Sequence, residues 1–328
     1  MRVLQILTTL AYGDAVGNDV LALQTTIKNM GYETGIYAEN IGKKMDADIV
    51  HYIDELPDIA DDDVIIYHLS TGTHLNYTIS KYPGRKLIVY HNITPPEYFE
   101  EYSEFAASLC KEGYKGLKHL SARADYCIAD SKYNKGDMID YGYKCKIDVL
   151  PILIPFSDYD KPANREVIDR YKDDGYTNIL FTGRIAPNKK QEDVILSYYY
   201  YKKYYNPKAR LFLVGNYEGM ESYYDRLLAF ADKLGAEDIV FTGHVGFDEI
   251  LSYYKLADIF LCESEHEGSC VPIVEAMYFN IPIIAYDAAA VGETMGQGGI
   301  LVKEKNHLEI AGLIDRVNTD ADLKKQII

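Results

Sequence analysis

The feature that most constrains the fold is an alternation between short, mostly apolar runs and longer segments with helical periodicity. Runs such as Val3–Leu7 and Ala209–Val214 are near-continuous in β-branched and aliphatic residues, which is typical of strands buried on both faces. Such strands belong to parallel sheets that helices cover on each side. The pattern therefore predicts an α/β chain built from doubly wound, Rossmann-like parallel sheets.

The alternation runs through both halves of the chain. In the first half, a helix is expected over Asn18–Met30, Ser131 is an expected helix N-cap, and the expected strands are Val3–Leu7, Thr34–Ala38, Val64–His68, Lys86–Tyr90, Tyr126–Ala129 and Ile147–Leu150. In the second half, the expected strands are Asn178–Thr182, Ala209–Val214, Ile239–Phe241, Ile259–Cys262, Ile283–Ala285 and Ile300–Val302. Helices are expected between them over Gln191–Tyr205, Met220–Leu234, Phe247–Leu256 and Pro272–Phe279.

A proline-rich break separates the two series. Pro151, Pro155 and Pro162 interrupt the pattern, so a linker is expected there, with one domain over 1–155 and a second over 156–328. The two sheets are expected to face each other across a cleft. Because ligands bind beyond the carboxyl ends of parallel strands, the loops that follow strands should carry the function.

Composition excludes several classes of protein. A formal net charge of −16 over 328 residues argues against non-specific nucleic-acid binding. The five cysteines have no paired CxxC spacing and the histidines no metal-ligand spacing, so we expect a reducing compartment and no metal site. No signal peptide and no run of about 18 apolar residues is evident, and a cytoplasmic location is expected.

The most informative local element holds two glutamates eight positions apart, Glu267 and Glu275. Residues three, four or seven apart would share a helix face, so this offset places Glu267 in a loop and Glu275 in the first turns of a helix. Pro272 is a natural first helical residue. The free amides of residues 268–270 would then point out of a helix start, which favours a phosphate, with one carboxylate on each side to bind sugar hydroxyls.

A second element follows the strand that ends at Thr182. Gly183 permits a tight exit from the strand, and Arg184 and Lys189 then share one loop at its carboxyl end. Two cations in such a place could hold a diphosphate and stabilise the charge that grows as it leaves. A solvated pair of surface charges is the alternative for this loop taken alone.

These two elements, in this order and separation, resemble the marks of retaining GT-B glycosyltransferases of family 4, the glycosyl transferases group 1. The resemblance extends through Phe241–Val245 and Gly298–Val302 and covers nearly the whole second domain. It is looser in the first domain, where it rests on Tyr90–Pro96 and Gly13–Asn18. Family members usually end with a helix that crosses back onto the first domain, and that helix is expected to be missing here.

The resemblance implies a role for each matching residue of the second domain. Arg184 and Lys189 would bind the donor diphosphate, with Gly183 at the start of their loop. Glu267 would bind hydroxyls of the transferred sugar, and Glu275 those of the ribose. Backbone amides of Gly268, Ser269 and Cys270 would meet sugar and phosphate, and the loop formed by Gly243, His244 and Val245 would lie against the base. Many relatives carry a bulky aromatic residue where Ser269 stands, so the donor identity does not transfer.

In the first domain, the resemblance implies that His91 lies near the anomeric carbon and that Gly13 and Gly17 let the first loop approach donor and acceptor. A histidine that caps backbone groups in a turn is the alternative for His91. Arg184 and Lys189 would take the place of a divalent cation against the diphosphate, so the resemblance implies a metal-independent reaction with no cofactor beyond a UDP- or GDP-linked sugar.

The expected function is therefore transfer of a sugar, with retention, to a saccharide or lipid-linked acceptor in polysaccharide or cell-surface glycan synthesis. A nucleotide-sugar epimerase of the same fold and a non-catalytic, nucleotide-binding GT-B protein remain alternatives. A dehydrogenase is disfavoured because residues 13–17 lack a GxGxxG pattern. Residues 111–146 carry eight basic and five acidic side chains, and this stretch could contact an anionic membrane surface, with ordinary solvated helix surface as the alternative.

Overall fold

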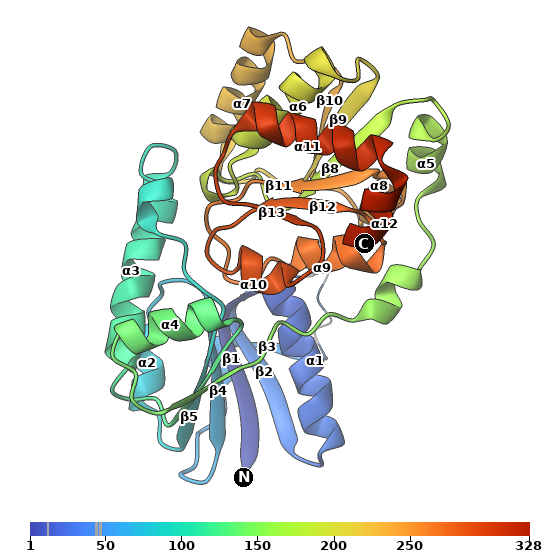
Figure 1. Ribbon diagram of the computed structural model, residues 1–328. Helices are drawn as coiled ribbons and strands as arrows, with labels where there is room; N and C mark the ends of the chain where they lie inside the picture. Colours follow the sequence, from blue (N-terminus) through green and yellow to red (C-terminus); the bar gives the residue numbers. More distant parts are fainter. Residues whose placement is uncertain (12, 43–44, 46–47) are drawn as a thin grey trace. The chain divides into compact units, whose positions relative to one another are not determined.

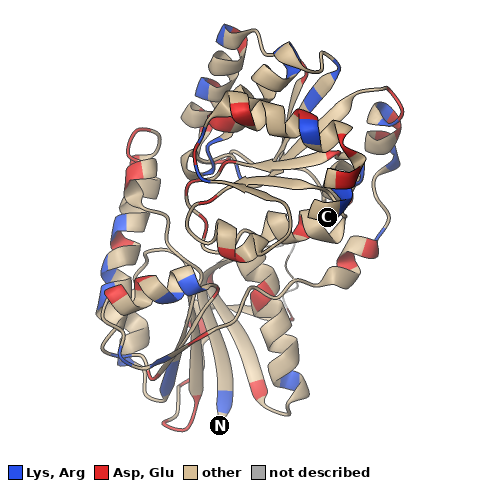
Figure 2. Cartoon of the chain, in the orientation of Figure 1, with Lys and Arg blue, Asp and Glu red and all other residues tan. Residues whose placement is uncertain are grey.

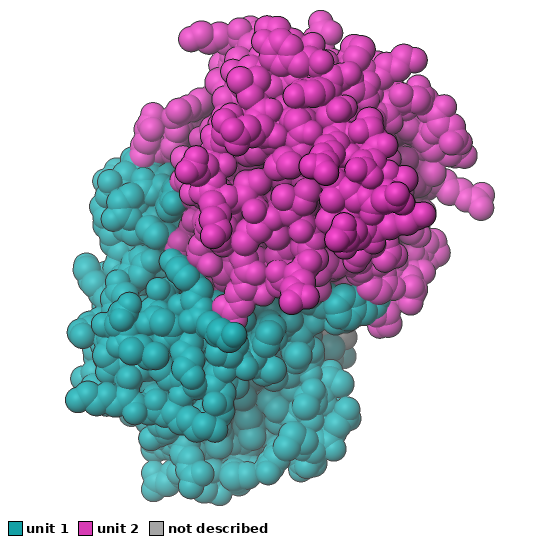
Figure 3. Space-filling model, in the orientation of Figure 1, with its two compact units in different colours: residues 1–100, 104–156 teal, residues 101–103, 157–328 magenta. Residues whose placement is uncertain are grey.

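The computed structural model describes residues 1–11, 13–42, 45 and 48–328. The chain divides into two compact units, which Figure 3 colours separately. Unit 1 comprises 1–100 and 104–156, and unit 2 comprises 101–103 and 157–328. The change of unit along the chain between Phe156 and Ser157 lies beside the boundary expected at residue 155.

Unit 1 is built on one parallel sheet of seven strands in the order β3-β2-β1-β4-β5-β6-β7. The strands are β1 Arg2–Leu10, β2 Glu33–Ile41, β3 Val50–Tyr52, β4 Val64–Leu69, β5 Arg85–Tyr90, β6 Tyr126–Ala129 and β7 Lys146–Val149. The helices are α1 Ala15–Asn29, α2 Leu75–Thr78, α3 Glu104–Leu120 and α4 Lys132–Asp140, with short 3₁₀ turns η1 Ile53–Glu55, η2 Ile79–Lys81 and η3 Pro96–Tyr98. In Figure 1, α1 lies on one face of this sheet and α2, α3 and α4 on the other.

Unit 2 is built on a parallel sheet of six strands in the order β10-β9-β8-β11-β12-β13. The strands are β8 Thr177–Thr182, β9 Ala209–Val214, β10 Ile239–Gly243, β11 Ile259–Cys262, β12 Ile283–Tyr286 and β13 Ile300–Val302. The helices are α5 Arg165–Tyr171, α6 Gln191–Tyr204, α7 Glu221–Leu234, α8 Phe247–Leu256, α9 Val271–Tyr278, α10 Val291–Met295, α11 His307–Thr319 and α12 Ala321–Ile327, with η4 Phe156–Asp160 and η5 Pro187–Lys189. The predicted fold class of two parallel-sheet α/β domains is confirmed.

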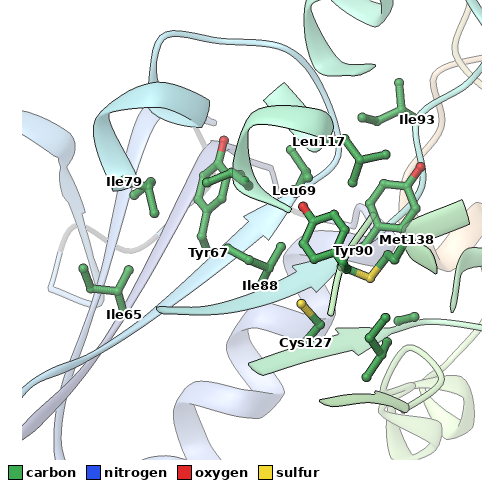
Figure 4. Packing of buried hydrophobic residues seen from close by; sticks show 14 of the residues in the cluster. Ile65, Tyr67, Leu69, Ile79, Ile88, Tyr90, Ile93, Leu117, Cys127 and Met138 are labelled. Atoms are coloured by element: carbon green, nitrogen blue, oxygen red, sulfur yellow. The ribbon is translucent and has the colours of Figure 1, made fainter. Parts of the chain in front are cut away.

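One hydrophobic cluster of unit 1 lies between its sheet and the helices α3 and α4, and two smaller clusters include residues of α1. Figure 4 shows Tyr67, Ile88 and Tyr90 of the central strands packed with Leu117 of α3 and Met138 of α4. All five are fully buried, and burying a side chain of this size stabilises the fold by roughly 1.5–3 kcal/mol. This rigid core fixes the carboxyl ends of β4, β5 and β6, from which the functional loops of the unit leave.

Most predicted elements are found within a few residues of their expected bounds. The Ser131 side chain accepts a hydrogen bond from the Asn134 amide at 3.1 Å, which confirms it as the N-cap of α4. The helix expected from Pro272 begins one residue earlier, so Pro272 is its second residue, where a missing N–H is also tolerated. Strand β3 and several helices, among them α2, α3, α5 and α10, were not predicted. Among the described residues, no helix is long and apolar enough to cross a membrane.

Candidate functional site

The candidate site of unit 2 lies where the strand order of its sheet reverses. β8 and β11 are neighbours in the sheet although two further strands separate them in sequence. The loop after β8 carries residues 183–190, and the loop after β11 carries residues 263–270. Since both strands run parallel, their carboxyl ends meet at one edge, and a reversal of strand order leaves a crevice there for a ligand. The two sequence elements are thus brought together by topology.

The side chains of Lys189 and Glu267 form an ion pair across these two loops. The Lys189 Nζ lies 2.5 Å from the Glu267 carboxylate, and the two side chains are only 20% and 8% exposed. Burial by itself lowers the pKa of Lys189, but the adjacent Glu267 carboxylate raises it more, so the net pKa lies above its usual value. The site therefore holds a charged ammonium whose counterion is already in place.

Asn188 holds the two loops together, and sequence reasoning missed it. The amide nitrogen of its buried side chain donates to the backbone carbonyl of His266 at 3.0 Å. The backbone carbonyl of Asn188 accepts a hydrogen bond from the backbone amide of Glu265 at 2.9 Å. The Glu267 carbonyl in turn accepts from the Ala290 amide at 3.1 Å, at the start of α10. The only sequence signal for Asn188 is its place between Pro187 and Lys189.

The start of α9 offers unused backbone donors beside the ion pair. The amides of Gly268, Ser269 and Cys270 donate no hydrogen bond to any residue that the structure describes. Because a helix start concentrates free N–H groups and the positive end of the helix dipole, these amides can bind an anion or a hydroxyl oxygen. The geometry expected for this segment from the sequence is therefore present, apart from the one-residue shift of the helix start.

Glu275 lies in the second turn of α9, and two tyrosines hold its carboxylate. Tyr159 donates to Oε1 at 2.6 Å and Tyr254 donates to Oε2 at 2.5 Å. Thr182, at the end of β8, lies 2.6 Å from the Tyr254 hydroxyl, and it must donate because the Tyr254 proton goes to the carboxylate. Burial raises the pKa of Glu275, and these two tyrosine hydrogen bonds oppose the rise. Each carboxylate oxygen keeps one lone pair for a ligand hydroxyl.

Arg184 differs from Lys189 in its surroundings. It is exposed, and its guanidinium makes no hydrogen bond or ion pair with the described part of the chain. Gly183 has φ +140°, a conformation that favours glycine, and a Cβ on Gly215 of the next loop would lie 2.0 Å from the Gly183 carbonyl oxygen. The backbone is thus held closely at the start of this loop, while the arginine side chain is free to meet a ligand.

The end of β10 and the loop after it carry the last three predicted donor-binding residues of unit 2, Gly243, His244 and Val245. Gly243 has φ +67° and forms a bridge with Gly215, which joins this loop to the one after β9. His244 is exposed and Val245 is half-buried against the core of the unit. None of the hydrogen bonds described for this loop reaches Lys189, Glu267 or Glu275, so no described hydrogen bond joins the loop to these residues.

In unit 1, the glycines of the first loop permit a close approach of the backbone. Gly13 has φ +78°, and a Cβ on Gly17 would lie 2.4 Å from the Ala11 carbonyl oxygen. Any larger residue at position 17 would therefore push α1 away from the end of β1. The two glycines serve the packing of α1 against this loop, whatever ligand it meets.

His91 follows β5, and its side chain is fully buried. Its Nδ1 lies 2.9 Å from Asp130 Oδ2, and its Nε2 lies 2.9 Å from His68 Nδ1. Burial by itself lowers the pKa of His91, but Asp130 raises it above the usual value, whereas burial lowers the pKa of His68 well below it. Sequence reasoning selected His91 but missed both partners, which lie 39 and 23 positions away.

Two clusters bring potential metal ligands together, which the spacing of the sequence had not indicated. Ligand atoms of Asp19, His68 and His91 lie within 4.8 Å of one another, and so do those of Cys262, Glu267 and Cys270. In the first cluster both ring nitrogens of His91 take other hydrogen bonds, and in the second the Lys189 ammonium lies against Glu267. A cation would have to displace these contacts, so neither cluster is well suited to a metal ion.

The chain is similar to several known proteins. The model of the family described as "Glycosyl transferases group 1" matches residues 161–328, just over half of the chain. The "Serotype-specific mannosyltransferase WbdA" of Escherichia coli is 22% identical over 331 residues, covering 97% of this chain and 39% of that protein. A "GDP-mannose-dependent alpha-(1-6)-phosphatidylinositol monomannoside mannosyltransferase" of Mycobacterium tuberculosis is 24% identical, covering 63% of this chain and 56% of that protein.

Solved structures share the fold. The crystal structure of Anabaena Alr3699/HepE in complex with UDP and glucose matches with a TM-score of 0.72 at 17% identity, covering all of this chain and 92% of that one. At this identity the match shows the fold alone, and it confirms the predicted GT-B class. The chain spans about two fifths of the length of the mannosyltransferase WbdA.

Proposed function

The chain belongs to the glycosyl transferases group 1 family, and on that premise we propose that it is a retaining, metal-independent glycosyltransferase. It transfers a sugar from a UDP- or GDP-linked donor to a saccharide or lipid-linked acceptor in the synthesis of a cell-surface glycan. The relatives, which include a serotype-specific mannosyltransferase and a GDP-mannose-dependent mannosyltransferase, support this substrate class. The transfer itself would take place in a reducing, cytoplasmic setting.

The observation that carries the proposal is the pairing of Lys189 with Glu267 beside the unused amides of residues 268–270. An ammonium has three N–H donors, and Glu267 occupies two contacts, so one donor remains for a phosphate oxygen. The same pair orients Glu267, which is proposed to accept hydroxyls of the transferred sugar. One small volume thus offers a cation, free amides and an acceptor carboxylate.

The remaining residues of unit 2 are proposed to complete the donor site. Arg184, exposed and without a partner among the described residues, would bind the diphosphate from the open side. Glu275 would accept the two ribose hydroxyls with the lone pairs that its tyrosines leave free. The loop of Gly243, His244 and Val245 would lie against the base.

Retention is proposed to follow a front-face route. A double displacement needs a carboxylate beneath the anomeric carbon, and the obvious contender, Glu267, is neutralised by Lys189 and would therefore be a poor nucleophile. The acceptor hydroxyl would instead approach from the side on which the diphosphate leaves, and a phosphate oxygen would take its proton. Lys189 and Arg184 would stabilise the charge that develops on the leaving group, which is the work a metal ion does elsewhere.

In unit 1, Gly13 and Gly17 are proposed to bring the first loop close to donor and acceptor. The buried ring of His91 has both nitrogens engaged, so its proposed contribution is to support that edge of the sheet from within.

A donor panel tests the proposal directly. The purified chain, mixed with UDP-, GDP-, CDP- and dTDP-sugars and a glycan acceptor mixture, is expected to release one nucleoside diphosphate, and EDTA should not reduce the rate. NMR of the product should show the anomeric configuration of the donor. Inversion would overturn the retaining mechanism, and loss of activity with EDTA would overturn metal independence.

The same panel separates the alternatives. An epimerase would return a nucleotide sugar with an inverted ring carbon and no product glycan. A non-catalytic binding protein would show a thermal shift with a nucleotide but no turnover, since a ligand at a hundred times its dissociation constant adds roughly 2.7 kcal/mol of stability. Either result would replace the transferase proposal.

A peripheral membrane contact through residues 111–146 is the further part of this proposal. Several of the lysines are already paired, with Lys111 2.7 Å from Glu100, Lys115 3.1 Å from Glu112 and Lys146 2.8 Å from Asp148. Figure 2 shows blue and red segments alternating along α3. Support comes instead from α4, on which Lys132 and two apolar side chains, Tyr133 and Ile139, are exposed.

Liposome sedimentation tests the membrane contact. The chain is expected to bind vesicles rich in anionic lipid, to release them at high salt, and to ignore neutral vesicles. Lys132→Glu with Lys135→Glu should weaken binding by at least about thirtyfold, because each basic residue near such a surface contributes about 1 kcal/mol and each 1.4 kcal/mol is a factor of ten. Lys324→Glu with Lys325→Glu in α12 is the charge-matched control. Absence of binding at low salt would end the membrane proposal and leave the transferase proposal intact.

A further inference from the structure

A chain of four buried polar side chains runs through the interior of unit 1, from Asp130 through His91 and His68 to Gln5. Three contacts of 2.9 Å join Asp130 Oδ2 to His91 Nδ1, His91 Nε2 to His68 Nδ1, and His68 Nε2 to Gln5 Oε1. The planes of the two imidazole rings are 6° from parallel and their centroids are 5.2 Å apart, which fits rings that meet through their nitrogen atoms. Both nitrogens of each ring therefore take part in a hydrogen bond. The proton positions follow from the two outer members of this hydrogen-bonded series, Gln5 and Asp130.

The Gln5 end determines the direction of every hydrogen bond. Its Nε2 lies 3.0 Å from the Val20 carbonyl oxygen, which can only accept, so this atom is the amide nitrogen and the other is the amide oxygen. The amide oxygen can only accept, and His68 must donate to it from Nε2. A neutral His68 then has a lone pair on Nδ1, and it must accept from His91 Nε2.

The other end of the chain then determines the charge of His91. Its Nε2 carries a proton for His68, and its Nδ1 faces a carboxylate oxygen of Asp130 at 2.9 Å. Two lone pairs cannot face each other at this distance, so a proton lies between them. Imidazole is the stronger base, with a reference pKa of about 6.5 against about 3.9 for an aspartate, so the proton belongs on Nδ1 and the pair is aspartate and imidazolium.

We propose that His91 is an imidazolium ion at neutral pH and acts as a positioning residue, with its charge held by Asp130 and its proton arrangement set by Gln5 through His68. The role of the cation is to keep the buried carboxylates around it ionised. Asp19 is the important one, because its Oδ1 accepts a hydrogen bond from the Leu153 amide at 2.9 Å. Leu153 lies in the segment by which the chain leaves unit 1, so the cation fixes that segment to α1 through Asp19.

The surrounding charges agree with a cation at this position. The groups that act on His91 are the carboxylates of Asp130, Asp19 and Asp14, which raise its pKa against the effect of burial. Burial raises the pKa of Asp19, and His91 counters that rise. His68 is fully buried and its pKa is lowered well below its usual value by burial, so the second ring is the neutral one.

Nitrogen NMR of the folded chain, labelled at histidine, tests the proposal without any substrate. Near pH 7, both ring nitrogens of His91 should carry protons, and His68 should be protonated only at Nε2. Asp130→Asn should lower the pKa of His91 by roughly one to three units, the size expected when an adjacent opposite charge is removed. As His91 loses its proton, exchange of the Leu153 amide should become faster.

Two matched controls complete the test. Asp140→Asn changes an exposed aspartate of α4 and should leave the titration of His91 unchanged. Gln5→Leu should allow His68 to change tautomer and should lower the pKa of His91. Gln24→Leu leaves the hydrogen bond from Gln5 to Val20 in place and should not change the pKa of His91. A neutral His91 in the unaltered chain at pH 7 would overturn the proposal, and this measurement does not depend on whether any variant folds. An Asp130→Asn chain that titrates like the unaltered one would overturn it too.

Discussion

Replacing Lys189 by methionine is expected to lower kcat/KM by about 10²–10³-fold, the usual cost of removing one preorganised electrostatic donor. Lys189 would stabilise charge on the leaving diphosphate, and it also orients Glu267 at 2.5 Å. The same change leaves a buried carboxylate without a counterion, which costs about 3 kcal/mol in the free energy of unfolding. Steady-state kinetics and urea unfolding measure the two effects separately.

Lys190→Met is the matched control because it changes the next residue of the same loop. Lys190 lies 3.4 Å from Glu265 and 3.9 Å from Glu192, with a side chain that is 27% exposed. A partly exposed pair of this kind contributes about 1 kcal/mol or less, so activity should change only a few-fold. If the two variants lose activity equally, Lys189 has no special role.

The double variant Lys189→Met with Glu267→Gln separates stability from catalysis. Removing both charges abolishes the unpaired carboxylate, so most of the lost stability should return, while activity should stay low. Coupled sites show interaction energies of about 0.5–3 kcal/mol in such cycles. A double variant that regained activity would contradict the proposed contact between Lys189 and the donor.

Replacing Glu275 by glutamine is expected to raise KM for the donor by about 10–100-fold with little change in kcat. Hydrogen bonds to a charged group contribute about 1.5–3 kcal/mol, and each 1.4 kcal/mol is a factor of ten in binding. Ribose contacts would be present equally in the ground and transition states, so their loss appears in KM. Glu309→Gln, an exposed carboxylate in the first turn of α11, is the control and should leave KM unchanged.

Although the Glu275→Gln variant should bind its donor more weakly, its free energy of unfolding should be higher than that of the unaltered chain. Burial raises the pKa of Glu275 above 4.5, so ionising this group costs stability in the folded chain. That cost is full above the raised pKa and disappears as the pH falls below 4.5. The variant should therefore melt at a higher temperature than the unaltered chain at pH 7. This difference in melting temperature should vanish once the pH falls below 4.5. A variant less stable at pH 7 would mean that the tyrosine hydrogen bonds outweigh the burial cost.

Local sequence patterns predicted much of the site because its residues follow strands. Gly183–Lys189 and Glu267–Glu275 each begin within a few residues of a strand end, and the parallel sheet brings such ends to one edge. The loop position of Glu267 and the helical position of Glu275 followed from their eight-residue offset and are confirmed. The cleft expected between the two domains stays a prediction.

Partners that lie far along the chain could not be predicted in this way. Tyr159 bonds a carboxylate 116 positions away, Asn188 a carbonyl 78 positions away, and His68 a ring 23 positions away. Tyrosine, asparagine and histidine are common in turns and helices for many reasons, and no local pattern distinguishes these three. Helix α3 was missed for a related reason, because residues 104–120 follow a proline turn and carry many charges among their apolar positions.

Most strands, the doubly wound class and the choice of Lys189, Glu267 and Glu275 as candidate residues were determined by the sequence, because periodicity and strand ends are local properties. The tertiary structure alone decided which atoms meet. It placed Lys189 against Glu267, gave Glu275 two tyrosine donors, and buried His91 between Asp130 and His68. The physical reason is that charge state and hydrogen-bond direction depend on burial and on groups brought together by packing, and neither is written in the spacing of residues along the chain.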